Sequence, residues 1–140
     1  MLVCIDSNVL LEIFSPRHAS RPIYHAWFEG RLRWAVSTEI LLEYEEIMQR
    51  HAGQRKADVM MQILALVKAK HGNLLQVTPS FRFHLISTDA DDDKFADCAI
   101  AIEADFIITH DRHFDVMRGS GYRPQPITPE DFIRLHLAGV

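Results

Sequence analysis

The chain alternates between short, continuous apolar runs and longer segments in which apolar residues recur every three or four positions. Runs of about four residues are too short for helices and predict buried strands. We predict strands at residues 2–5, 34–37, 74–77 and 106–109, and a short edge strand at residues 126–127.

The longer periodic segments predict helices between these strands. Ser7 is a candidate N-cap for a helix over VLLEIF, and Ser37 or Thr38 can cap the helix that contains most of the glutamates. Further helices are predicted at about 20–30, 38–52, 54–71 and 91–103, and residues 128–131 begin a last one.

This order of elements indicates an α/β fold with three layers, in which helices cover both faces of a mainly parallel central sheet. Residues 79–89 form an irregular connection that contains the ambiguous segment FRFHLI, and residues 119–125 form a turn-rich loop. At 140 residues the chain has the length of one domain, so we expect residues 1–140 to fold as a single domain.

Composition narrows the setting of this domain. The apolar fraction of 48% is typical of an ordinary globular protein. The first apolar run lacks a basic leader and no apolar run is long enough to span a membrane, so we expect a cytoplasmic protein with no membrane partner. Cys4 and Cys98 are expected to be buried, reduced thiols. The net charge of −4 argues against extensive wrapping of nucleic acid, but it does not exclude a local cluster of acids neutralised by a cation.

Two aspartates follow predicted strands. Asp6 comes directly after the first strand, and Asp111 lies just beyond the strand at residues 106–109. Both should emerge at the C-terminal edge of the sheet, where ligands collect in open parallel α/β folds. Either aspartate alone is more often a helix cap or a loop acid. The pair is therefore the informative feature.

Asp97 lies in a helix that is otherwise apolar on nearly every face, which indicates a buried helix. An ionised carboxylate there needs a basic partner, several hydrogen bonds or a metal ion. Asp93 lies one turn earlier on the same face and adds a like charge. A metal site is favoured, and an ion pair between Asp97 and a distant arginine or lysine is the alternative.

Other polar residues are less informative. Glu43 borders the apolar stripe of its helix, but position alone does not select it over Glu39 or Glu46, and most such glutamates are surface acids. His110 and His113 have a spacing that could bind a transition metal, although solvated loop histidines are more common. Basic residues that could contact phosphates are more often solvated surface: Arg17, Arg21, Arg50, Arg55, Lys56 and Arg112.

Taken together, the segments VCIDSNVLLEIF, STEILLEYEEIMQR, DADDDKFADCAIAIEADFIITHDRHF and PITPEDFI resemble the PIN domain family, and in particular its branch of toxin components from toxin–antitoxin systems. The resemblance covers almost the whole chain. It implies a five-stranded parallel sheet and identifies the family's catalytic, metal-binding acids with Asp6, Glu43, Asp97 and Asp111. Asp93 is implied as a further metal ligand, with Asn8 and Thr109 as polar groups that support the ligands.

The same resemblance implies an activity. PIN toxins are usually ribonucleases that use Mg²⁺ or Mn²⁺, often form homodimers, and are held inactive by an antitoxin protein. Asp6, Asp97 and Asp111 would coordinate one or two ions, and Glu43 would be a ligand or would orient the attacking water. One departure from the family is His110, where many relatives have a small residue, and the overall acidity of the chain is another. We therefore expect a metal-dependent endoribonuclease acting on RNA.

Other classes of protein fit the pattern less well. A haloacid dehalogenase-type phosphatase also begins with an aspartate after its first strand, but it needs a second acid where this chain has Asn8. A receiver domain would need a phosphoacceptor aspartate paired with a lysine after later strands, and no convincing pair is visible. A catalytically silent PIN scaffold that binds RNA or protein remains an alternative, because intact ligands do not by themselves establish turnover.

Overall fold

The computed structural model describes residues 1–78, 90–118 and 123–138, with the backbone alone for residues 90–93. The predicted irregular connection at residues 79–89 and residues 119–122 of the predicted turn-rich loop lie outside this part of the chain.

Five strands form one sheet in the order β3-β2-β1-β4-β5, and every pair of neighbours is parallel. This confirms the predicted parallel sheet with five strands. The central strand β1 pairs with β2 on one side and with β4 on the other, so that Cys4 lies opposite Ile107. The strands are β1 (Leu2–Ile5), β2 (Arg33–Val36), β3 (Leu74–Gln76), β4 (Phe106–Ile108) and β5 (Gln125–Ile127).

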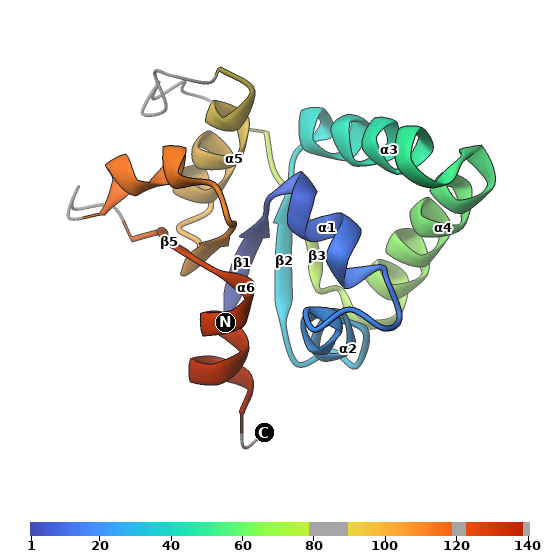
Figure 1. The fold of residues 1–140 in the computed structure, drawn as a ribbon, viewed down its shortest axis with the longest axis horizontal. Coiled ribbons are helices and arrows are strands. Elements are labelled where there is room, and N and C mark those ends of the chain that lie inside the picture. The colour runs from blue at the N-terminus through green and yellow to red at the C-terminus, as the bar shows by residue number, and fades with distance from the viewer. Residues whose placement is uncertain (79–89, 119–122, 139–140) are drawn as a thin grey trace.

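Helices cover both faces of the sheet, as predicted. Figure 1 shows α5 on one side of the strands and helices α1 to α4 on the other. None of the helices within the described ranges has the length and apolar character needed to cross a membrane. The α-helices are α1 (Ser7–Ile13), α2 (Arg21–Phe28), α3 (Thr38–Ala52), α4 (Gln54–His71), α5 (Ala90–Ala101) and α6 (Pro129–Phe132). A 3₁₀-helix at Arg112–Met117 and a π-helical segment at Ile133–Leu137 were not predicted.

Among the described α-helices, α3 and α6 begin with a side-chain cap. The Ser37 hydroxyl accepts a hydrogen bond from the Ile40 N–H at 3.2 Å and caps α3. Thr128 caps α6 in the same way. The prediction that Ser7 caps α1 is wrong, because Ser7 is the first residue of α1 and Asp6 holds the N-cap position. The Ser7 hydroxyl is instead used in a contact with another helix.

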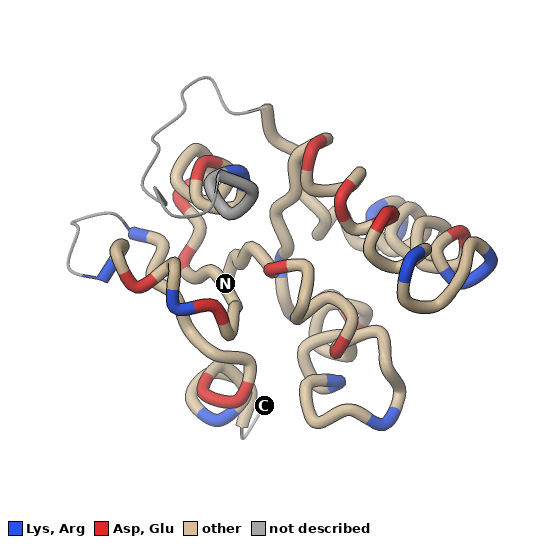
Figure 2. Tube along the Cα trace, turned by 45° about the horizontal axis from the view of Figure 1, so that its top comes forward, with Lys and Arg blue, Asp and Glu red and all other residues tan. Residues whose placement is uncertain are grey.

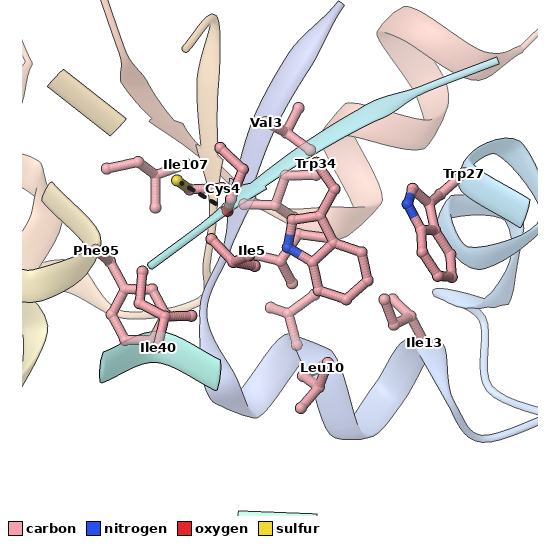
Figure 3. Packing of buried hydrophobic residues seen from close by; sticks show 14 of the residues in the cluster. Val3, Cys4, Ile5, Leu10, Ile13, Trp27, Trp34, Ile40, Phe95 and Ile107 are labelled. Carbon is pink, nitrogen blue, oxygen red and sulfur yellow. Dashed lines mark hydrogen bonds between the residues drawn. The ribbon is translucent and has the colours of Figure 1, made fainter. Parts of the chain in front are cut away.

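A continuous core of large side chains fills the space between the sheet and its helices (Figure 3). Trp34 of β2 packs edge-on against Trp27 of α2, with ring centroids 5.1 Å apart. Cys4 and Cys98 are buried and form no disulfide, as predicted. This core makes β1 and β2 a rigid base for the residues that follow them.

Tyr44 ties α3 to the C-terminal end of β1. Its buried hydroxyl donates a hydrogen bond to the Ile5 carbonyl and accepts one from the Trp34 indole at 3.4 Å. Burial raises the pKa of Tyr44 well above its usual range, so the hydroxyl remains a donor at every physiological pH. Since Ile5 immediately precedes Asp6, this contact brings α3 up to the edge of the sheet where Asp6 emerges.

Candidate functional site

Asp6 lies at the C-terminal edge of the sheet, as predicted from its place after β1. Its backbone N–H donates to the Ile108 carbonyl at 3.0 Å, which continues the pairing of β1 with β4. Only 5% of the residue is exposed. Its Oδ2 accepts a hydrogen bond of 2.7 Å from the Thr109 hydroxyl, so the carboxylate is held in a fixed position against the next strand.

Thr109 connects Asp6 to Asp111. The same Thr109 oxygen that donates to Asp6 accepts a hydrogen bond from the Asp111 N–H at 2.9 Å. The Asp111 carboxylate in turn accepts from the His113 N–H at 2.9 Å and caps the 3₁₀-helix. The ends of β1 and β4 therefore place two acids and one hydroxyl in a single hydrogen-bonded unit.

Glu43 approaches this unit from α3. Its Oε2 accepts a hydrogen bond from the Ser7 hydroxyl, and Ser7 directly follows Asp6. Its Oε1 lies 2.6 Å from the Nζ atom of Lys94 on α5. Figure 2 shows acidic positions along both α3 and α5. The ends of β1 and β4 and the helices α1, α3 and α5 thus contribute to one charged cluster, which we call the acid site: Asp6, Ser7, Glu43, Lys94, Thr109 and Asp111.

The electrostatics of Asp6 reflect both burial and like charges. Burial is the largest effect and raises the pKa of Asp6. Hydrogen bonds from the Thr109 hydroxyl and the Ser7 N–H lower that pKa in part, while the charges of Asp111 and Glu43 raise it further. The balance is a raised pKa, which means that the folded protein holds the Asp6 carboxylate in an environment that disfavours its ionised form.

The other residues predicted for the site are Asp97, Asn8 and Asp93. Asp97 is 2% exposed on α5, as expected for its apolar helix, and lies one turn after Lys94. Asn8 is exposed as the second residue of α1. The Asp93 side chain lies outside the described residues. Hydrogen bonds and electrostatic interactions thus join Asp6, Glu43, Asp111 and Thr109 in the acid site, and the roles predicted for Asp97, Asp93 and Asn8 stay predictions.

Two residues of the acid site were missed in the sequence. Lys94 follows a run of acids at the start of α5, and in that setting it is an ordinary solvated lysine. Ser7 matched a helix-cap pattern, which concealed its contact with Glu43. The only sequence signal for Lys94 was its place three residues before the buried Asp97. The His110 side chain contacts Glu12, with its Nε2 2.8 Å from Glu12 Oε2.

The donor chemistry of the acid site fits a divalent cation. Carboxylate oxygens are the ligands that Mg²⁺ and Mn²⁺ prefer, and the mutual repulsion of Asp6, Asp111 and Glu43 would be relieved by a positive charge. A formed coordination sphere is not seen. Among the residues that the structure describes, no three His, Cys, Asp or Glu side chains are close enough to hold one ion. Glu43 contacts the Ser7 hydroxyl and the Lys94 ammonium through its two oxygens.

A parallel α/β sheet that gathers acids from two adjacent strands at its C-terminal edge defines the class of protein. The sequence model of the PIN domain matches residues 2–113, and the chain belongs to the PIN domain family. No curated protein matches the chain. Among solved structures, it is similar to the crystal structure of VapBC2 from Rickettsia felis bound to a DNA fragment from their promoter. The two share 14% identity, with a TM-score of 0.59, over 90% of this chain and 98% of that one.

The raised pKa of Asp6 predicts how its replacement alters stability. A carboxyl whose pKa is raised by folding contributes stability that is fully present below its unfolded-state pKa and is lost as pH rises through the folded-state pKa. Asp6→Asn imitates the protonated form. We therefore expect the variant, in EDTA at pH 7, to melt roughly 2–5 °C above the wild type, and the difference to close as the pH falls below about 4.

Thermal melting followed by circular dichroism at several pH values measures this effect. The control is Asp115→Asn, because Asp115 is an exposed acid paired with Arg118 and should give no gain. An Asp6→Asn protein that melts at or below the wild-type temperature at pH 7 would show that the acid site does not strain the metal-free protein.

Proposed function

We propose that this chain is a divalent-metal-dependent endoribonuclease, that residues 1–140 form its single domain, and that it acts in the cytoplasm as the toxin of a toxin–antitoxin pair. The observation that carries the proposal is the convergence of Asp6, Glu43 and Asp111 from three elements. Such a cluster is costly for a fold to maintain, since it buries or half-buries like charges. A cation that binds there would offset the cost and give the cluster a use.

In the proposed enzyme Asp6, Asp97 and Asp111 would hold the metal, Asp93 would be a further ligand, and Glu43 would be a ligand or would orient the attacking water. The bound metal would be Mg²⁺ or Mn²⁺, one or two ions, and would supply hydroxide at neutral pH and stabilise the leaving oxygen. Thr109 fixes the direction of the Asp6 carboxylate and the Asp111 backbone through its two hydrogen bonds. Asn8, which is exposed beside Ser7, would support the metal ligands as a neighbouring polar group.

Two comparisons support this proposal. Membership of the PIN domain family supports a nuclease, and the sequence resemblance to ribonuclease toxins supports RNA as the substrate. The similar solved structure is of VapBC2, which supports a toxin with an antitoxin partner. A homodimer is proposed on the sequence resemblance alone.

Removal of one acid tests the activity. Purified protein incubated with single-stranded and structured RNA in Mn²⁺ or Mg²⁺ should cleave it, and EDTA should stop the reaction. Asp6→Asn and Asp111→Asn should each reduce the rate at least about 100-fold, because each removes a proposed metal ligand. Asp115→Asn is the matched control and should keep full activity, since Asp115 is an exposed acid paired with Arg118. Unchanged cleavage by Asp6→Asn would place the active site elsewhere, and no cleavage by any protein would favour the silent PIN scaffold.

A groove of about 470 Å³ between the α1–α2 turn and the α3–α4 pair offers a surface for the proposed antitoxin. The Arg21 guanidinium lies 3.9 Å from the centre of the Tyr24 ring at one side. Arg55 and Lys56 line the groove from the start of α4, where Figure 2 shows basic positions gathered near the α3–α4 connection. The apolar lining consists of Phe14, Pro16, Tyr24, Met48, Val59, Met60 and Ile63.

This combination suits an amphipathic segment with acidic residues. An apolar floor binds one face of a helix or strand, and three cations at the rim complement carboxylates in a chain whose own net charge is −4. RNA is a weaker fit to this groove because the lining is mainly apolar. We therefore propose that the antitoxin places an acidic amphipathic segment here.

Two exposed apolar residues of α4 allow a matched test. Val59 lines the groove, whereas Leu66 is 68% exposed two helical turns further along α4 and does not line it. Val59→Glu should weaken inhibition by the antitoxin at least about 10-fold in a titration of RNA cleavage, because it adds a charge to the apolar floor. Leu66→Glu should leave inhibition unchanged. Equal effects of the two substitutions would argue against the groove as the antitoxin site.

A further inference from the structure

Lys94 is the cation of the acid site in the protein without metal. Its Nζ lies 2.6 Å from Glu43 Oε1, and the two side chains are only 16% and 19% exposed. The other Glu43 oxygen accepts from the Ser7 hydroxyl. Glu43 is therefore held between a cation from α5 and a hydroxyl from α1, and each of its oxygens already has one of these partners.

The position of Lys94 is set by the carboxylates around it. Lys94 lies in the N-terminal half of α5, where the helix dipole disfavours a positive charge. Holding a long lysine side chain in one place also costs conformational entropy. Lys94 is the only basic residue in the α5 sequence and directly follows three aspartates of the same helix. The attraction of Glu43, with Asp97 one turn away, must offset both costs.

We infer that Lys94 is a resident counter-ion that competes with a divalent cation for Glu43 and so sets the metal concentration at which the acid site loads. This inference rests on the proposed function. The observation behind it is that the Glu43 carboxylate contacts the Lys94 ammonium as well as the Ser7 hydroxyl. Lys94 is a positioning residue in this account, because it acts through Glu43.

The inference predicts tighter metal binding when the ammonium is removed. Lys94→Met keeps the aliphatic stem and deletes the charge, so Mn²⁺ should bind about 3- to 10-fold more tightly than to the wild type, as expected for the loss of a competing ion pair. Lys94→Arg keeps the charge and should stay within about twofold of the wild type. Lys70→Met removes an exposed lysine at the end of α4 and controls for the change in net charge.

Isothermal titration with Mn²⁺ alone, without RNA, measures the dissociation constants of these four proteins, and melting in EDTA establishes that each is folded. A second series in the Glu43→Gln background isolates the pair: there Lys94→Met should change Mn²⁺ affinity less than about twofold, because its competition acts through Glu43. Lys94→Gln repeats the test should Lys94→Met fail to fold.

The outcomes separate the two proposals. If the wild type binds Mn²⁺, and Lys94→Met binds it more tightly while Lys70→Met does not, the counter-ion role of Lys94 is supported. If the wild type binds Mn²⁺ and Lys94→Met binds it equally or more weakly, the counter-ion role of Lys94 is overturned and the proposed nuclease function is unaffected. A wild-type protein that binds no Mn²⁺ overturns both.

Discussion

The carboxylate of Asp6 is buried at the end of the central strand, within the field of two other acids. Burial and the like charges of Asp111 and Glu43 disfavour its ionised form, and only hydrogen bonds from Thr109 and Ser7 oppose them. The rest of the site can be understood as a response to this one constraint. Thr109 fixes the geometry, Lys94 supplies a local positive charge, and a divalent cation would supply more. Such a cluster lowers the free energy of unfolding of the metal-free protein, as is common at functional sites.

The fold places these charges through contacts far from them. Adjacent pairing of β1 and β4 puts Asp6 beside Thr109, and the Tyr44 hydroxyl on the Ile5 carbonyl brings α3 to the same edge. The aromatic packing of Trp34 with Trp27 and Tyr44 keeps that connection rigid. Changes in the core between β1, β2 and α3 would therefore shift Glu43 relative to Asp6 even though they touch neither residue.

Much of the fold followed from the sequence because continuous apolar runs and helical periodicity reflect local burial. The parallel sheet, its strands and the positions of Asp6 and Asp111 at one edge were all predictable in this way. Glu43 was selected by resemblance alone, since several glutamates border the same helix face. Lys94 and Ser7 could not be predicted, because their contacts join α5, α3 and α1, and a pairing between distant elements leaves no local pattern. The Ser7 side chain matched a cap pattern and was used for a tertiary contact instead.

The central claim is that the carboxylates at the end of β1 and β4 form one cation-binding site. Paramagnetic broadening by substoichiometric Mn²⁺ in ¹H–¹⁵N correlation spectra of the wild-type protein tests it most directly, because the effect falls steeply with distance from the ion. The account predicts that the amide signals of Asp6, Ser7 and Asp111 broaden first and that Asp6→Asn abolishes this selectivity. Broadening that begins at exposed acids such as Glu46 or Asp131, or that spreads evenly over the surface, would contradict it.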